Sequence, residues 1–431
     1  MTRLSGSRNV ARLAAAAAIF GLTGCPRGGG GGPVAPAGRR WTLASEAPVR
    51  GVALLYEATI VLTDGDRARR VAGDGRVAWT AVLGASAAGV AIDGEVVAVA
   101  VGGAAGTAVP GLATGLRGEP GAAVVGLAVV DGARRWTVGV GSTKWAVISH
   151  VGASGNGFLV TGSFAGTLRV GARTVTSAGT TDGFVAELDR AGAVRSLVRV
   201  GGDGPDEITG AAALGGGKIA IAGTFTGTAE LRGETLVAID AEAASADGFV
   251  AVLDADGRPA WLRTWGGPGE DTCAGVVALA GGSLAVAGTV RGEVEVAGRV
   301  LTARGNADGL VAVFGPDADV RGAWLVGGDD FDGITAVAGA ADQIAIAGWF
   351  TGALPSSAGT LRAAGVDDAF VALGTAAGIS QVMQLASAGP AAVTALAGSP
   401  AGAALAVHAT EPLHVDGDQR PAGASLWFRS W

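Results

Sequence analysis

Short apolar segments recur along this chain, and most are bracketed by glycine or by polar turn residues. Three of them read KIAIAG (218–223), SLAVAG (283–288) and QIAIAG (343–348). This pattern is typical of short β-strands joined by tight turns, because glycine adopts positive φ without steric cost. Beyond the N-terminus no uninterrupted run of about 18 apolar residues occurs, so the hydrophobicity indicates a buried sheet rather than membrane helices.

The segments belong to a repeat with regular spacing. Its most regular marker is an aspartate before an apolar run, and successive copies stand 65, 61 and 60 residues apart at Asp182, Asp247, Asp308 and Asp368. Each unit offers four strands, with an excursion between the second and third that we expect to form a small hairpin. Four antiparallel strands per unit predict one blade of a β-propeller, because a single blade cannot bury both of its faces.

The flanking sequence completes a ring. Residues 48–84 and 85–141 each provide four strands, whereas the C-terminal stretch provides only three. Residues 39–43 (RRWTL) match the fourth strand at 134–138 (RRWTV), so we expect strand 39–45 to complete the last blade. Closure between the two termini would remove exposed sheet edges. We therefore predict an all-β, seven-bladed propeller over residues 39–431, with six or eight blades as alternatives.

Several steps of the repeat resemble the SBBP-type β-propeller repeat of bacterial exported proteins. These steps are GTFTG after the second strand, DGFVA at the start of the third, and W…GG at the end of the fourth. The resemblance covers roughly residues 142–386. It implies the fold and carries no single activity.

The N-terminus predicts export and lipidation. Residues 1–24 combine arginines with the apolar run LAAAAAIFGL, as in a signal peptide. The run ends in Leu22-Thr23-Gly24-Cys25, which resembles the lipobox of bacterial lipoproteins and implies a lipid on Cys25. Residues 25–38 are rich in Gly and Pro and indicate a flexible tether. No aspartate follows Cys25, which favours the outer membrane, with the periplasmic or surface side left open.

Composition narrows the possible functions. The formal net charge is −7, with 31 Lys and Arg against 38 Asp and Glu, which argues against nucleic acid as a partner. Only two cysteines occur. With Cys25 lipidated, Cys273 has no disulfide partner, and we expect it to be a small buried residue.

Acidic residues recur in the loops that join the fourth strand of one blade to the first strand of the next. These candidate binding residues are Asp203, Asp206, Glu207, Glu270, Asp271, Asp329, Asp330 and Asp332. We expect them near the mouth of the central channel, on the same face as the excursions. A ring of carboxylates there would suit Ca²⁺ or a basic partner. The alternative, which we favour for metal, is that these residues only form turns.

Two repeated residue types have a structural interpretation. The aspartates that precede the third strand recur in every clear copy, so we expect them to cap that strand rather than to catalyse a reaction. The tryptophans of the fourth strand are expected to pack between blades, with a sugar-stacking platform as the alternative; they are Trp79, Trp136, Trp261 and Trp324.

Together these features favour a non-enzymatic lipoprotein, a monomer that binds an envelope protein or polysaccharide through one propeller face. No catalytic residue and no cofactor is assigned. The alternative is an envelope glycan hydrolase or lyase with its site at the channel mouth. Unlike polar residues contributed by single loops would favour the enzyme, and equivalent residues repeated in every blade favour the scaffold.

Overall fold

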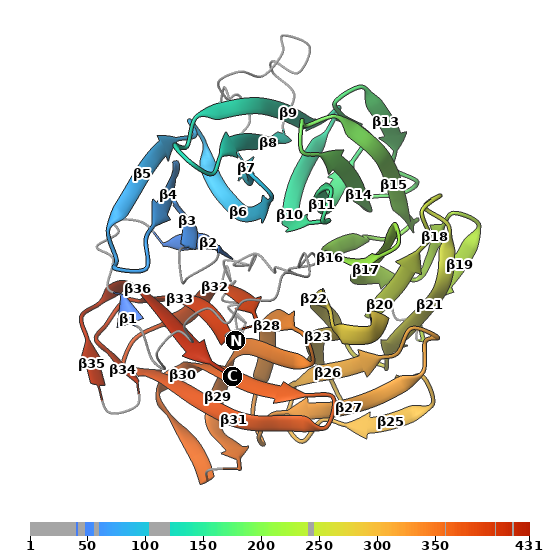
Figure 1. Ribbon diagram of the computed structural model, residues 1–431. Coiled ribbons are helices and arrows are strands. Elements are labelled where there is room, and N and C mark those ends of the chain that lie inside the picture. The colour runs from blue at the N-terminus through green and yellow to red at the C-terminus, as the bar shows by residue number, and fades with distance from the viewer. Residues whose placement is uncertain are drawn as a thin grey trace, which may run out of the picture.

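The predicted seven-bladed β-propeller is confirmed. A computed structural model describes residues 40–41, 48–55, 60–102, 121–239, 245–357, 359–400, 402–415 and 418–431. These residues form seven antiparallel sheets arranged as blades around one axis (Figure 1). Within each blade the strands are named A to D from the axis outward. The predicted signal peptide (1–24) and tether (25–38), including Cys25, lie outside the described residues.

The first four blades follow one another along the chain. Blade 1 consists of β2 (Val49–Leu54), β3 (Ile60–Asp64), β4 (Arg67–Val71) and β5 (Val77–Val82). Blade 2 consists of β6 (Ser86–Asp93), β7 (Val96–Gly102), β8 (Gly121–Ala128) and β9 (Arg134–Ser142). Blade 3 consists of β10 (Trp145–Ala153), β11 (Gly157–Ala165), β14 (Asp182–Asp189) and β15 (Val194–Gly202). Blade 4 consists of β16 (Glu207–Gly215), β17 (Lys218–Thr226), β20 (Ala246–Leu253) and β21 (Pro259–Gly266).

The remaining three blades complete the circle. Blade 5 consists of β22 (Thr272–Ala278), β23 (Leu284–Val290), β26 (Asp308–Phe314) and β27 (Val320–Val326). Blade 6 consists of β28 (Asp332–Ala340), β29 (Gln343–Ser356), β30 (Gly359–Thr375) and β31 (Gly378–Ser387). Blade 7 consists of β32 (Ala391–Ser399), β33 (Gly402–Ala409), β36 (Gly423–Ser430) and β1 (Arg40–Trp41). A 3₁₀ turn, η3 (Ala280–Gly282), links β22 to β23.

The ring is closed by both termini, as predicted. Strand β1 pairs antiparallel with β36, with Arg40 opposite Trp427 and Trp41 opposite Leu426. The rest of the predicted 39–45 strand lies outside the described residues. Each innermost strand contacts the innermost strands of both neighbouring blades, and β2 contacts β32 across the closure.

The predicted excursions are hairpins. The sequence did not predict which strand each hairpin pairs with. Each pairs with the outermost strand of the preceding blade rather than with its own. These hairpins are β12 (Thr167–Val170) with β13 (Arg173–Thr176), β18 (Thr228–Leu231) with β19 (Glu234–Val237), β24 (Glu293–Val296) with β25 (Arg299–Thr302), and β34 (Leu413–Val415) with β35 (Asp418–Arg420). They extend the sheets of blades 2, 3, 4 and 6 to six strands. In blade 6 the excursion is continuous with β29 and β30.

A repeated aromatic contact fills blades 3, 4 and 6. Phe225 lies opposite Asp247 in the ladder, and its ring meets that of Phe249 edge-on, with centroids 6.2 Å apart. The same register and a comparable ring contact recur in blades 3 and 6. All of these rings are fully buried. The repeated phenylalanines are therefore packing residues. Because successive side chains of a strand point to opposite faces, one face of each blade packs against the neighbouring blade.

The tryptophans of the outermost strands pack between blades, as predicted. The indole N–H of Trp79 donates to the carbonyl of Val129 in the next blade, at 2.8 Å. Trp136 and Trp261 make the equivalent bond, at 2.8 and 3.0 Å. Trp324 packs against the core shared by blades 5 and 6.

The described residues contain no helix long and apolar enough to cross a bilayer.

Candidate binding face

The loops from strand D to the next strand A lie on the same face of the ring as the hairpins, because strand direction alternates within each blade. We call this the D–A face. The predicted acidic residues all lie there, but they divide into two groups with different surroundings. One group is buried between blades, and the other is exposed to solvent.

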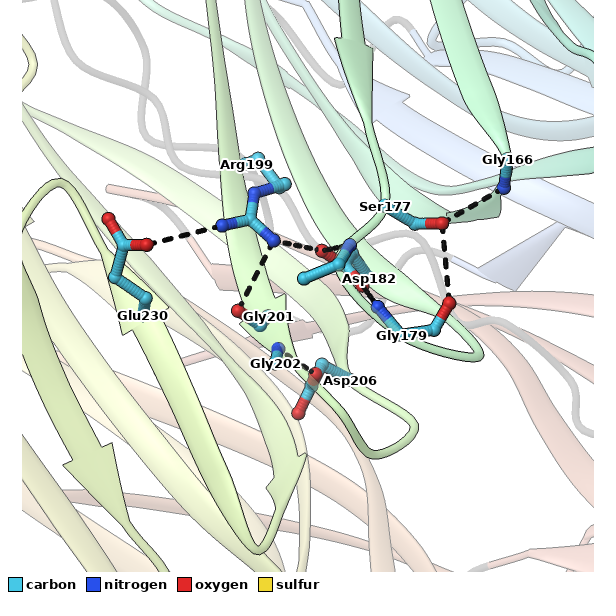
Figure 2. A network of polar contacts seen from close by, with 10 residues as sticks. Gly166, Ser177, Gly179, Asp182, Arg199, Gly201, Gly202, Asp206 and Glu230 are labelled. Carbon is cyan, nitrogen blue, oxygen red and sulfur yellow. Dashed lines mark hydrogen bonds and ion pairs between the residues drawn. The ribbon is translucent and has the colours of Figure 1, made fainter.

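Asp206 belongs to the buried group and holds three segments together. Its Oδ2 accepts a hydrogen bond from the backbone N–H of Gly202 at 2.7 Å, and its Oδ1 accepts one from Thr226 at 3.2 Å. Its own N–H donates to the carbonyl of Thr181 in the preceding blade at 2.9 Å. Asp206 therefore ties the D–A loop to the end of strand B and to the neighbouring blade. Figure 2 shows its bond to Gly202.

Asp271 and Asp332 repeat this arrangement in blades 5 and 6. The carboxylate of Asp271 accepts from the backbone N–H groups of Gly267 and Arg291, each at 2.8 Å. Asp332 binds the backbone in the equivalent way, and all three aspartates are essentially inaccessible to solvent. These residues serve a structural purpose that blades 4, 5 and 6 share, and they are not a surface for a partner.

The aspartates that open strand C cap it, as predicted. The carboxylate of Asp182 accepts from the backbone N–H of Ala178 at 2.9 Å and forms an ion pair with Arg199 at 2.6 Å (Figure 2). Arg199 also reaches Glu230 of the adjoining hairpin at 3.4 Å. Equivalent backbone hydrogen bonds are accepted by Asp247, Asp308 and Asp368.

The two sets of buried aspartates lie close to one another, which affects their protonation. Burial raises the pKa of Asp206 and of Asp271 to about 7, and that of Asp332 to about 6. The hydrogen bonds from backbone N–H groups oppose this shift, and the charge of the nearby strand-C aspartate adds to it. Near neutral pH each site thus carries less than the full charge of two carboxylates.

The Gly-Gly step that ends strand D is explained by close approach. A Cβ on Gly266 would lie 2.2 Å from Oδ1 of Asp247, and a Cβ on Gly267 would lie 2.0 Å from the carbonyl oxygen of Glu293 in the hairpin. Blades 3 and 5 show the same two close approaches at their own Gly-Gly steps. The glycines let the strand, the capping aspartate and the hairpin meet in one place.

The exposed group consists of Asp203, Glu270, Asp329 and Asp330. Glu207 lies between the two groups: it is half-buried and accepts a hydrogen bond from the Ser149 hydroxyl at 2.6 Å. Among the described residues no three His, Cys, Asp or Glu side chains gather in a way that could hold a metal ion. Calcium binding by the exposed carboxylates therefore stays a prediction.

The structure adds exposed aromatic residues to this face. Phe331, between Asp330 and Asp332, is 40% exposed, and the guanidinium of Arg291 lies 5.9 Å from its ring centroid. Trp145, at the start of blade 3, is 38% exposed. The sequence did carry a signal for Phe331, because this loop has an aromatic residue where the other two acidic loops have Pro205 and Glu270.

Two potentially reactive side chains are buried in the innermost strands and are not exposed on this face. Cys273 is 4% exposed, and burial raises the pKa of its thiol to about 12, which confirms the prediction that it is a small buried residue. Burial lowers the pKa of His150 to about 4, so this imidazole is neutral at physiological pH. Neither side chain has the exposure that nucleophilic or general-base chemistry requires.

Comparisons with known proteins show no family for this chain. No family model matches the chain, and no curated protein matches its sequence. Among solved structures, BamB from Moraxella catarrhalis is 16% identical, with a TM-score of 0.43 over 88% of this chain and 85% of that one. Sqt1 from Saccharomyces cerevisiae is 10% identical, with a TM-score of 0.44 over 91% and 99%. A quinohemoprotein alcohol dehydrogenase from Pseudomonas putida is 9% identical, with a TM-score of 0.44 over 88% and 66%.

Proposed function

We propose that this protein is a lipid-anchored, non-enzymatic binding module of the bacterial envelope, and that its D–A face docks an envelope protein with a basic surface. The observation that carries the proposal is the division of the acidic residues. The repeated buried aspartates are fully engaged by the fold. The exposed acids and aromatics are free to meet a partner.

The chemistry of the exposed residues favours a protein partner. Phe331 and Trp145 offer the large aromatic surfaces that dominate protein–protein interfaces. The surrounding carboxylates of Asp329, Asp330 and Glu270 would steer a basic surface toward them. Cys273 and His150 are buried, so neither offers a catalytic group on this face.

The proposed anchor is compatible with the closed ring. Fourteen residues, 26–39, separate Cys25 from strand β1. Extended, they reach at most about 50 Å, so the tether would leave the ring beside its own closing strand. An outer-membrane anchor on Cys25 would then hold the propeller close to the bilayer.

Crosslinking in intact cells followed by affinity purification tests the proposal. We expect one envelope protein to be recovered reproducibly with the wild-type chain and to be lost when Asp329, Asp330 and Glu270 are changed to Asn, Asn and Gln. The Cys25→Ala chain should leave the membrane fraction. Recovery of polysaccharide alone, or equal recovery with the charge-neutralised chain, would overturn the assigned partner and face.

A further inference from the structure

A groove of about 630 Å³ opens between blades 2 and 3, away from the D–A loops. Its walls are the middle of strand β9, the turn of the β12–β13 hairpin and the C–D turn of blade 3 at residues 192–194. Arg169 and Arg173 line it, and no carboxylate does.

The repeat shows that these arginines are peculiar to this groove. The hairpins of blades 3, 4 and 5 align residue by residue, with Arg169 at the position of Glu230 and Glu295. In both of the other hairpins this glutamate accepts a hydrogen bond from a backbone N–H of its own turn, at 3.2 Å. An arginine cannot accept that bond. Arg169 therefore departs from a local rule that the other two copies obey, and such departures mark functional positions.

Only one nitrogen of the Arg173 guanidinium makes a hydrogen bond to a described residue. Its Nε donates to the carbonyl of Val194 at 3.2 Å, which leaves its terminal nitrogens uncommitted to any described residue. Arg299, at the same position in blade 5, binds the carbonyl of Val320 at 3.0 Å. That arginine shares its hairpin with Glu293 and Glu295, so of these three aligned hairpins only that of blade 3 carries arginine without an acid on its strands.

A third residue of the groove also differs from its equivalents. Thr137, on β9, stands where the outermost strands of blades 3 and 4 have Leu197 and Leu262. Its hydroxyl oxygen is buried and has no hydrogen-bond partner among the described residues. A buried hydroxyl without a partner is unfavourable, and a ligand in the groove would offset that cost.

We propose that the groove between blades 2 and 3, lined by Arg169, Arg173 and Thr137, binds a phosphate group carried on an organic molecule. Two guanidinium groups match the charge of about −1.5 to −2 that a phosphate monoester carries at neutral pH, whereas a carboxylate would compensate only one. Guanidinium groups also bind phosphate oxygens in a bidentate way. The volume exceeds that of phosphate alone, and Val138 and Val194 provide an apolar wall for the attached body.

Phosphate in the envelope could come from a soluble ester or from a lipid headgroup, and two probes separate these sources. We would titrate the full chain with glycerol 3-phosphate by calorimetry and measure its sedimentation with phosphatidic acid or phosphatidylcholine vesicles. A lipid anchor inserts into both kinds of vesicle alike. A preference for phosphatidic acid, whose headgroup is a phosphate monoester, that is lost when the arginines are replaced assigns a lipid headgroup, whereas saturable binding of glycerol 3-phosphate without such a preference assigns a soluble ester.

Three variants make the test specific. R169E introduces the glutamate of the other hairpins, so its thermal midpoint should equal or exceed that of the wild type. R169E/R173E should lower the affinity for the bound probe at least tenfold. R299E removes the same structural bond as R173E at a distant groove and should leave the affinity within twofold. An equal loss in R299E, or no saturable binding of either probe to the wild type, would overturn the proposal.

Discussion

The backbone N–H of Asp206 donates a hydrogen bond of 2.9 Å to the carbonyl of Thr181 in the preceding blade. The same bond joins Asp271 to Ala246, and Asp332 to Ala307. Each junction is reinforced by the aspartate carboxylate, which binds two further backbone N–H groups. The repetition of these aspartates is therefore explained by a need that the junctions into blades 4, 5 and 6 share.

Replacing one of these carboxylates should weaken a junction measurably. Asp271→Asn retains one acceptor oxygen, so it can satisfy only one of the N–H groups of Gly267 and Arg291. An unsatisfied buried N–H costs about 1–3 kcal/mol. We expect the free energy of unfolding to fall by about that amount in urea titrations. Glu270→Gln, at the exposed neighbouring position, is the control and should stay within about 0.5 kcal/mol of the wild type.

The raised pKa values predict a pH dependence with a definite sign. In the unfolded chain these aspartates titrate near 3.8, and in the folded chain at about 7, 7 and 6. Between about pH 4 and 7 the folded state therefore binds more protons, and the contribution of these groups to stability falls as the pH rises.

The neutral triple variant D206N/D271N/D332N isolates this contribution from other titrating groups, such as His150. Its free energy of unfolding is to be subtracted from that of the wild type at pH 5 and at pH 8. We expect the difference to be larger at pH 5. An equal difference at pH 5 and at pH 8 would show that the carboxylates are already charged at pH 5.

The close approach at the Gly-Gly step gives a steric prediction. In Gly267→Ala the new Cβ would lie 2.0 Å from the carbonyl oxygen of Glu293, so the hairpin must shift. Overpacking of this kind costs about 1–3 kcal/mol. Gly102→Ala is the matched control, because no atom of the described part of the chain lies within 4 Å of its Cβ position. Equal melting temperatures for the two variants would mean that the hairpin does not pack closely against strand D.

The fold could be predicted because its signals are local and repeated. The Phe225–Asp247 step recurs at a fixed spacing, and the match of 39–43 to 134–138 revealed the closing strand. The pairing of each hairpin with the preceding blade was not predictable, because that contact joins segments through space and leaves no pattern within either one.

The candidate site was predicted less completely, for a related reason. Composition cannot separate Asp271, which is buried and bonded on both oxygens, from Glu270, which is exposed. Both belong to the same acidic loop, and only the geometry of the turn decides which of them faces solvent. Arg169 was not predicted, because it stands out only when the hairpins are aligned and it is compared with Glu230 and Glu295 at the same position.

Closure by the N-terminal strand predicts a loss of cooperativity when that strand is removed. Deletion of residues 39–44 would leave the outer edge of β36 without its partner strand. We expect a broader thermal transition at a lower midpoint, measured by circular dichroism in the β-sheet region. An unchanged transition would show that the pairing of Arg40 with Trp427 does not hold the ring together.

Site-specific photo-crosslinking in living cells tests most directly whether the D–A face binds the partner. A photoreactive residue would replace Phe331 on that face or, as a control, Val130 in a C–D turn on the opposite face, where it is 71% exposed. We predict one discrete crosslinked envelope protein from position 331 and none from position 130. Crosslinks from position 130 alone, or the same product from both positions, would contradict the assignment of the binding face.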